Sequence, residues 1–156
     1  MHRNLAFLSV ILLLALSGCA SLPTGVERPI SSHTDRDREP SRIASYADAY
    51  LRKHPGKSGF WLLGDGLDAY AARVLLAEAA DRTIDVQYYL YHDDITGRVL
   101  TYRLLKAADR GVRVRLLLDD MATKGIDSPL ATLASHPSIE VRIVNPYANR
   151  GFRGLE

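Results

Sequence analysis

The sequence lacks a second cysteine, an excess of charge of one sign, and an apolar run long enough to cross a bilayer. Cys19 is the one cysteine in 156 residues, so the chain can form no internal disulfide and no cysteine-rich zinc site. The 20 basic and 18 acidic side chains leave a net charge of +2, so no strong field favours nucleic acid, and we predict no such partner. The amino-terminal apolar run, Leu5–Leu16, is shorter than the roughly 20 residues that a membrane span needs.

Two common catalytic motifs are also missing. No serine lies in a Gly-x-Ser-x-Gly turn, and no phosphate loop of the Gly-x-x-x-x-Gly-Lys type occurs. Two acidic clusters remain as candidates, and each has a plainer interpretation that we favour. His92-Asp93-Asp94 could bind a metal or act as an acid and base, but it suits a loop that caps a helix. Asp119-Asp120 could hold magnesium, but it suits a strand end whose carboxylates bond loop amides, so we expect no metal and no cofactor.

The amino terminus reads as a targeting signal. A short basic start precedes Leu5–Leu16, and Leu16-Ser17-Gly18-Cys19 follows. This ending resembles the bacterial lipobox, in which the cysteine is acylated and becomes the new amino terminus. We therefore predict a lipoprotein signal peptide at 1–18 and lipid attachment at Cys19, which would be the contact with the membrane. Because Ala20 and not Asp follows, the expected location is the bacterial cell envelope, at the outer membrane facing the periplasm.

Beyond Cys19 the chain divides into a tether and one domain. Residues 19–42 are rich in proline, serine and alternating charges, which predicts a flexible, lipid-anchored linker. Residues 43–156 are long enough for one domain. Apolar periodicity within it predicts a short helix at Ile43–His54 and then, in order, strand, helix, strand, helix, strand, helix, strand, at 60–63, 67–80, 84–91, 96–110, 112–118, 130–135 and 139–144.

This alternation predicts an α/β domain with a mostly parallel sheet and βαβ crossovers. Ligand groups in such sheets gather beyond the carboxyl ends of the strands. Tyr89, Tyr91 and Asp119 lie at those ends, so we predict them as a possible active-site wall. We also expect strands 84–91 and 112–118 to be apolar on both faces and to need cover on both sides.

Two runs carry a resemblance to a known family. Ile84-Asp85-Val86-Gln87-Tyr88-Tyr89-Leu90-Tyr91-His92-Asp93-Asp94 and Gly111-Val112-Arg113-Val114-Arg115-Leu116-Leu117-Leu118-Asp119-Asp120, with the later strand that ends at Asn145-Pro146, resemble the first catalytic half of cardiolipin-synthase-like members of the phospholipase D superfamily. The resemblance covers roughly residues 58–150. It implies an enzyme that acts on phospholipid phosphodiesters, by hydrolysis or phosphatidyl transfer, without a metal.

In that family, two His-x-Lys-x-x-x-x-Asp motifs meet at one site: one histidine attacks the phosphodiester and the other serves as acid and then base. No histidine of this chain has lysine two positions later, so no catalytic residue can be assigned. We therefore expect residues 43–156 to form a truncated, incomplete phospholipase D-like domain that is inactive alone. The alternative is a non-catalytic, membrane-anchored lipoprotein that binds a partner or a lipid.

Overall fold

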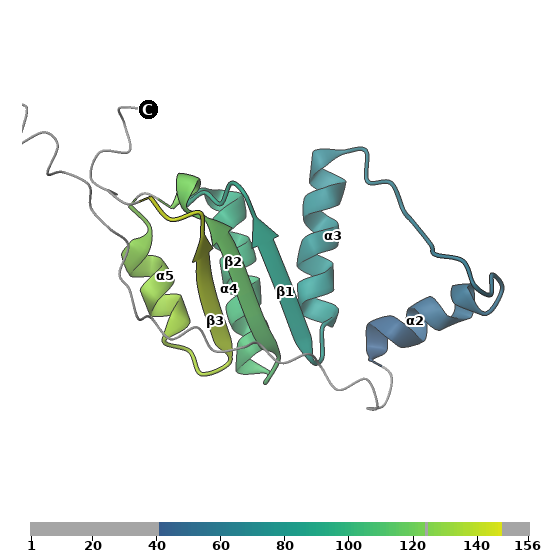
Figure 1. The fold of residues 1–156 in the computed structure, drawn as a ribbon. Helices are drawn as coiled ribbons and strands as arrows, with labels where there is room; N and C mark the ends of the chain where they lie inside the picture. Colours follow the sequence, from purple (N-terminus) through teal and green to yellow (C-terminus); the bar gives the residue numbers. More distant parts are fainter. Residues whose placement is uncertain (1–40, 124, 148–156) are drawn as a thin grey trace, which may run out of the picture. The chain divides into compact units, whose positions relative to one another are not determined.

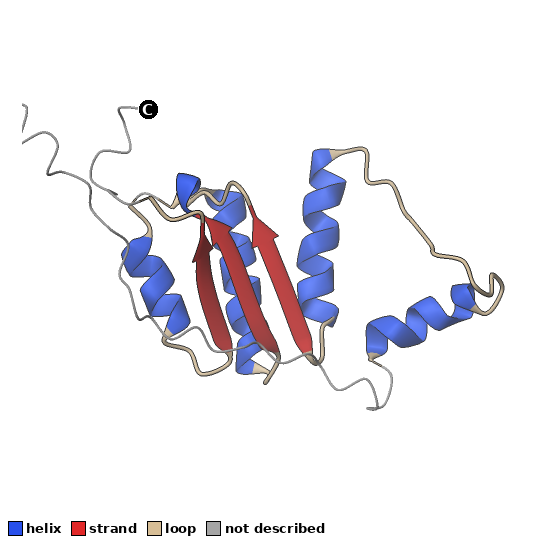
Figure 2. Ribbon diagram, viewed as in Figure 1, coloured by secondary structure: helices blue, strands red, loops and turns tan. Residues whose placement is uncertain are grey.

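The computed structural model describes residues 41–123 and 125–147. The predicted signal peptide, Cys19 and all but the last two residues of the predicted linker lie outside these ranges. The secondary structure belongs to one unit, Ser32–Asn145. Its elements are α2 (Arg42–Leu51), α3 (Gly66–Ala79), β1 (Thr83–Tyr88), α4 (Ile95–Asp109), β2 (Arg113–Asp119), the 3-10 turn η1 (Asp120–Ala122), α5 (Asp127–Ala134) and β3 (Ile139–Val144) (Figures 1 and 2).

The three strands form a parallel sheet in the order β1-β2-β3, and a helix connects each strand to the next (Figure 2). Ile84 is opposite Val114, which is opposite Ile139, and Tyr88 is opposite Leu118. The predicted α/β class, the parallel sheet and these two crossovers are confirmed. Gly111 has a φ of +89° directly after α4, as expected for a glycine that ends a helix.

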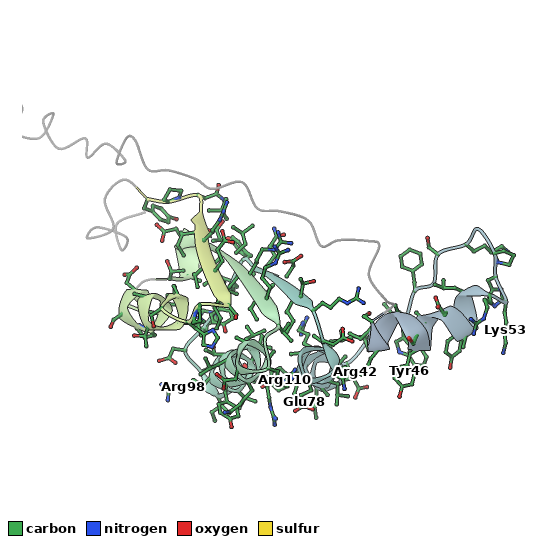
Figure 3. All side chains as sticks on the ribbon, turned by 90° about the horizontal axis from the view of Figure 1, so that it is seen from below. Arg42, Tyr46, Lys53, Glu78, Arg98 and Arg110 are labelled. Carbon is green, nitrogen blue, oxygen red and sulfur yellow. The ribbon has the colours of Figure 1, made fainter. Side chains whose placement is uncertain are left out.

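Side chains along each strand alternate between the two faces of the sheet, and the buried ones on one face form the core. Helices α3, α4 and α5 lie in a single layer on this side (Figure 3). Leu104, Val114, Leu116 and Leu118 are each at most 1% exposed, so the centre of β2 and the middle of α4 pack most tightly. The other buried members of this cluster are Ala77, Tyr91, Leu100, Ala108, Leu130, Leu133 and Ile139.

The opposite face is polar, and the prediction of strands apolar on both faces is wrong. The alternate residues of β1 and β2 include Asp85 and Arg115, whose side chains form a bidentate ion pair at 2.5 and 2.6 Å. Arg142 of β3 likewise pairs with Glu140. Alternation in Ile-Asp-Val-Gln-Tyr and Val-Arg-Val-Arg-Leu sends every second side chain to this face, so it exposes little apolar surface.

Residues 60–63, predicted as a strand, have no regular structure. Phe60, Trp61 and Leu62 are 96%, 88% and 92% exposed. In Figure 1 they belong to the loop between α2 and α3, which runs clear of the sheet and returns to the amino end of α3. The prediction is wrong for this structure because a strand needs a hydrogen-bonded neighbour and this segment has none in the part of the chain that the structure describes.

Contacts with α4 hold α3 in the helix layer. The Arg110 guanidinium donates hydrogen bonds to the backbone oxygens of Ala77, Glu78 and Ala80 at 3.0–3.3 Å. These carbonyls lie at the carboxyl end of α3, where a cation is favourable. Arg103 pairs with Glu78 at 2.6 Å. The position of α3 beside α4 is therefore fixed at several points.

Candidate functional site

The carboxyl ends of the three strands lie at one edge of the sheet, because the strands are parallel and in register. Tyr89 follows β1, Asp119 is the last residue of β2, and Asn145 follows β3. This edge is where ligand groups gather in parallel sheets. It is therefore the candidate functional site.

Asp119 links the ends of β2 and β3. One carboxylate oxygen accepts a hydrogen bond from the backbone N–H of Met121 at 2.9 Å, and the other accepts one from Nδ2 of Asn145 at 2.7 Å. Asn145 has a φ of +51°, in the left-handed region that asparagine tolerates better than most residues. The pair thus fixes the direction in which the chain leaves β3. The favoured interpretation of Asp119 as a strand-end carboxylate that bonds a loop amide is confirmed.

The buried Asp120 supports the same turn. It is fully buried, and its carboxylate accepts a hydrogen bond from the hydroxyl of Thr123, itself fully buried, at 2.6 Å. The η1 turn after β2 is therefore held from inside by Asp120 and from the surface by Asp119.

The two predicted tyrosines occupy different surroundings. Tyr89 is 58% exposed, and its hydroxyl lies 2.9 Å from Sδ of Met121, so it joins the edge that contains Asp119. Tyr91 is 7% exposed, and its hydroxyl shares a 2.6 Å hydrogen bond with Thr101 in α4. Burial raises the pKa of Tyr91, although the bond to Thr101 opposes the shift. The structure thus brings Tyr89 and Asp119 together and places Tyr91 in the core, and the role of all three as a wall stays a prediction.

Asp93 and Asp94 stabilise the start of α4. Asp94 is the N-cap, and one carboxylate oxygen accepts the N–H of Gly97 at 2.8 Å and the hydroxyl of Thr96 at 2.7 Å. The hydrogen bond from Gly97 is the main cause that lowers the pKa of Asp94. Asp93 accepts two hydrogen bonds from Arg98, at 2.7 and 3.0 Å, which lower its pKa. The favoured interpretation of this cluster as a helix cap is confirmed.

A small hollow of about 150 Å³ lies over this cap. Tyr70, Tyr91, His92 and Gly97 contribute to its lining, together with Arg73, Tyr88, Leu90, Asp94, Thr96 and Leu100. His92 contributes an imidazole, but no lysine follows it two positions later. The hollow therefore has the size for a small group and lacks the residue pair that the family's chemistry would need.

In the ranges 41–123 and 125–147, no three His, Cys, Asp or Glu side chains group closely enough to hold a metal ion. None of the helices in those same ranges is long and apolar enough to cross a membrane.

Sequence reasoning missed Met121, and it placed Asn145 at a strand end without predicting its contact with Asp119. Met121 lies in η1 and contacts Tyr89, and Asn145 contacts Asp119 because Asp119 pairs with Val144 in the sheet. Both contacts depend on the tertiary structure. The signal for Asn145 was its place between a strand and Pro146, because proline lacks the N–H that would continue the ladder.

The chain is similar in sequence to several bacterial proteins. It is 54% identical over 114 residues to "Cardiolipin synthase C" of Escherichia coli, a match that covers 73% of this chain and 24% of that protein. An uncharacterized protein of Helicobacter pylori strain 26695 is 39% identical over 155 residues, which cover 97% of this chain and 30% of the relative. "Cardiolipin synthase A" of Pseudomonas entomophila is 30% identical over 81 residues, or 52% of this chain and 17% of that one. The chain thus spans less than a third of the length of each of these relatives.

The comparisons with family models and with solved structures show less similarity. No family model matches the chain. Among solved structures, TrmBL2, an archaeal chromatin protein, aligns with a TM-score of 0.46 and 17% identity, over 67% of this chain and 42% of that one, a likeness too low to carry an argument. Sequence identity to proteins named cardiolipin synthase, together with the parallel α/β sheet, decides the assignment. The chain belongs to the phospholipase D superfamily and is cardiolipin-synthase-like over the stretch that these matches cover.

Proposed function

We propose that this chain supplies part of the scaffold of a phospholipase D-like enzyme that acts on phospholipid phosphodiesters, by hydrolysis or phosphatidyl transfer, and that it has no activity alone. The observation that carries the proposal is the 54% identity to cardiolipin synthase C over 114 residues. Identity at this level over 114 residues supports a shared scaffold. The substrate class is the one that the relative's name indicates.

The proposed lack of activity rests on the sequence. In the mechanism that the resemblance implies, a histidine attacks phosphorus and a lysine two positions later stabilises the phosphate charge. None of the five histidines here has that lysine. At the strand ends, the described side chains of Tyr89, Asp119 and Asn145 provide a hydroxyl, a carboxylate and an amide, which can position neighbouring segments. They include no phosphorus nucleophile of the family's type.

An assay of the purified chain tests this proposal. Phosphatidylglycerol and a second phospholipid would be offered in mixed micelles, and both headgroup release and cardiolipin formation would be measured. We expect rates equal to those of a control that carries only residues 1–42. Turnover clearly above that control would contradict the proposed dependence on His-x-Lys motifs.

We further propose that Cys19 anchors the chain to the membrane of a bacterial cell envelope, at the outer membrane facing the periplasm. The sequence Leu16-Ser17-Gly18-Cys19 supports the anchor and Ala20 supports the outer membrane; these residues lie outside the described ranges. Cys19→Ser should leave the signal uncleaved or release the protein from membranes. A variant that matures and fractionates like the parent would rule out the lipid anchor.

A further inference from the structure

Helix α2 carries a row of large side chains on one face that stays in water. Ile43, Tyr46, Tyr50 and Leu51 recur at helical spacing, so they share one side of α2. All four are exposed, and Tyr46 and Tyr50 are 80% and 74% exposed. No residue of α2 is buried. In a globular domain such a face normally packs on the core, so this face is suited to a surface outside the domain.

The contacts that fix α2 lie at its amino end. The N–H of Arg42 donates a hydrogen bond to the Asp81 carboxylate at 2.9 Å, and the hydroxyl oxygen of Ser41 accepts the N–H of Ala44 at 3.1 Å. Tyr46 lies beyond these contacts along the helix (Figure 3). The part of α2 that carries both tyrosines is therefore accessible to a second surface.

A turn directly after α2 carries positive charge. Backbone hydrogen bonds of 3.0–3.2 Å order residues 52–57. Arg52, Lys53 and Lys57 are exposed there, and no acidic residue occurs in 49–64. None of these three cations forms an ion pair in the part of the chain that the structure describes. An exposed aromatic face thus continues into a cluster of cations that other residues leave uncompensated.

The size and chemistry of this surface favour a lipid bilayer over a protein. The ten residues of α2 make a helix about 15 Å long and about 10 Å wide, so its face covers on the order of 150 Å², against about 800 Å² per partner in a stable protein interface. A bilayer needs no matching shape. Tyrosine rings are favoured at the level of lipid headgroups, and basic side chains are attracted to anionic lipids.

We propose that α2 and the turn 52–57 lie on a bilayer that contains anionic phospholipid. Tyr46 and Tyr50 enter the headgroup layer, and the cations of the turn lie beside lipid phosphates. Helix α2 begins at the end of the predicted linker 19–42, so the anchor proposed at Cys19 would keep it near a membrane. This contact goes beyond the anchor because it sets which side of the domain faces the bilayer. It does not depend on the proposed activity.

A tryptophan placed in α2 reports on the contact. Trp61 is the one tryptophan of the chain, so Trp61→Phe leaves room for a single reporter. Full-length Tyr50→Trp/Trp61→Phe would be compared with Tyr102→Trp/Trp61→Phe, the matched control. Tyr102, in α4, is 52% exposed and has two cations within 6 Å of its ring centroid, at 5.9 and 5.8 Å, so it resembles Tyr50 in exposure and charge.

Both reporters would be reconstituted with vesicles of phosphatidylglycerol and phosphatidylcholine, so attachment through the amino terminus is common to them. We expect the emission at position 50 to shift to the blue and a brominated phospholipid to quench it at least about twofold, with neither change at position 102. Salt at about 1 M, where the Debye length is about 3 Å, should weaken the effect, and vesicles of phosphatidylcholine alone should give little of it.

Charge variants of the position-50 reporter test the recognition of anionic lipid. Arg52→Gln, Lys53→Gln and Lys57→Gln together should reduce the quenching to the level at position 102. Removal of the same charge from α3 and α4, by Arg73→Gln, Arg98→Gln and Lys106→Gln, is the matched control and should leave the quenching unchanged. Far-ultraviolet circular dichroism should be the same for both triple variants.

Four results would overturn the proposal. One is a folded chain on vesicles whose position 50 stays as exposed to water as position 102. Another is a blue shift without vesicles that grows with protein concentration, which would assign the face to a second copy. An equal shift with polyglutamate in place of vesicles would assign it to an acidic protein. An equal shift on phosphatidylcholine alone, unchanged by the three substitutions in the turn, would exclude recognition of anionic lipid.

Discussion

Substitution of Gly97 by alanine tests the local structure at the start of α4. In an open helix this change stabilises, because glycine is destabilising by up to about 1 kcal/mol relative to alanine. At Gly97, a Cβ atom would lie 1.9 Å from the backbone oxygen of His92 and 3.2 Å from its carbonyl carbon. Both are main-chain atoms, so no side-chain rotation relieves the overlap. The chain between His92 and the Asp94 cap must move instead.

Overpacking of this kind costs about 1–3 kcal/mol. The shift would also disturb the hydrogen bond from the N–H of Gly97 to Asp94. We therefore expect Gly97→Ala to destabilise the domain by about 1–3 kcal/mol, which lowers a urea midpoint by roughly 1 M for a typical slope.

Urea unfolding followed by circular dichroism measures the effect. Gly66→Ala, at the first residue of α3, is the matched control, because a Cβ there meets nothing within 4 Å. That variant should be neutral or slightly more stable than the parent. If Gly97→Ala proves as stable as Gly66→Ala, the close approach of His92 to the helix start is not present in solution.

Three further experiments probe the cap, the strand ends and the core. The pKa of Asp94 is lowered in the folded chain, so its contribution to stability is complete above its unfolded pKa and is lost as the pH falls through the folded pKa. Asp94→Asn keeps a capping side chain that does not titrate. The loss of stability of this variant below about pH 4 should therefore be less steep than that of the parent. A double-mutant cycle of Asp119→Ala and Asn145→Ala should give a coupling energy of about 0.5–3 kcal/mol in urea unfolding. If the two single losses of stability simply add, the 2.7 Å hydrogen bond between these side chains is not formed in solution. Leu104→Ala, at a side chain 1% exposed, should cost about 2–5 kcal/mol in thermal or urea unfolding, whereas Leu75→Ala, at 62% exposure, should change stability by less than about 0.5 kcal/mol; similar costs at both positions would contradict the described core.

The sequence predicted the elements well where the local signals were strong. The β-branched and aromatic run at 84–91 and the helical spacing after Asp94 correspond to β1 and α4 within three residues at each end. Asp94 and Gly111 were identifiable as helix-end residues because capping depends on local chemistry. The parallel direction of the strands was predictable from the lengths of the connections.

The errors arose where the answer depends on tertiary contacts. A run such as 60–63 becomes a strand only if a neighbour pairs with it, and that neighbour is set by the tertiary structure. The polar second face could have been read from the alternation of Arg113 and Arg115 with valines, but the apolar run at 116–118 concealed the period. Tyr89 and Tyr91 are two residues apart and both follow β1, yet Tyr89 stays exposed while the chain turns Tyr91 into the core.

The most direct test of the central claim is cardiolipin formation by a chimera. The stretch of Escherichia coli cardiolipin synthase C that matches this chain over 114 residues would be replaced by the matching residues of this chain. If the two stretches share one scaffold, the purified chimera should form cardiolipin within about tenfold of the parent rate, a change of about 1.4 kcal/mol in the barrier. A folded, membrane-associated chimera whose rate equals that of a parent lacking this stretch would contradict the assignment of the chain to a cardiolipin-synthase-like scaffold.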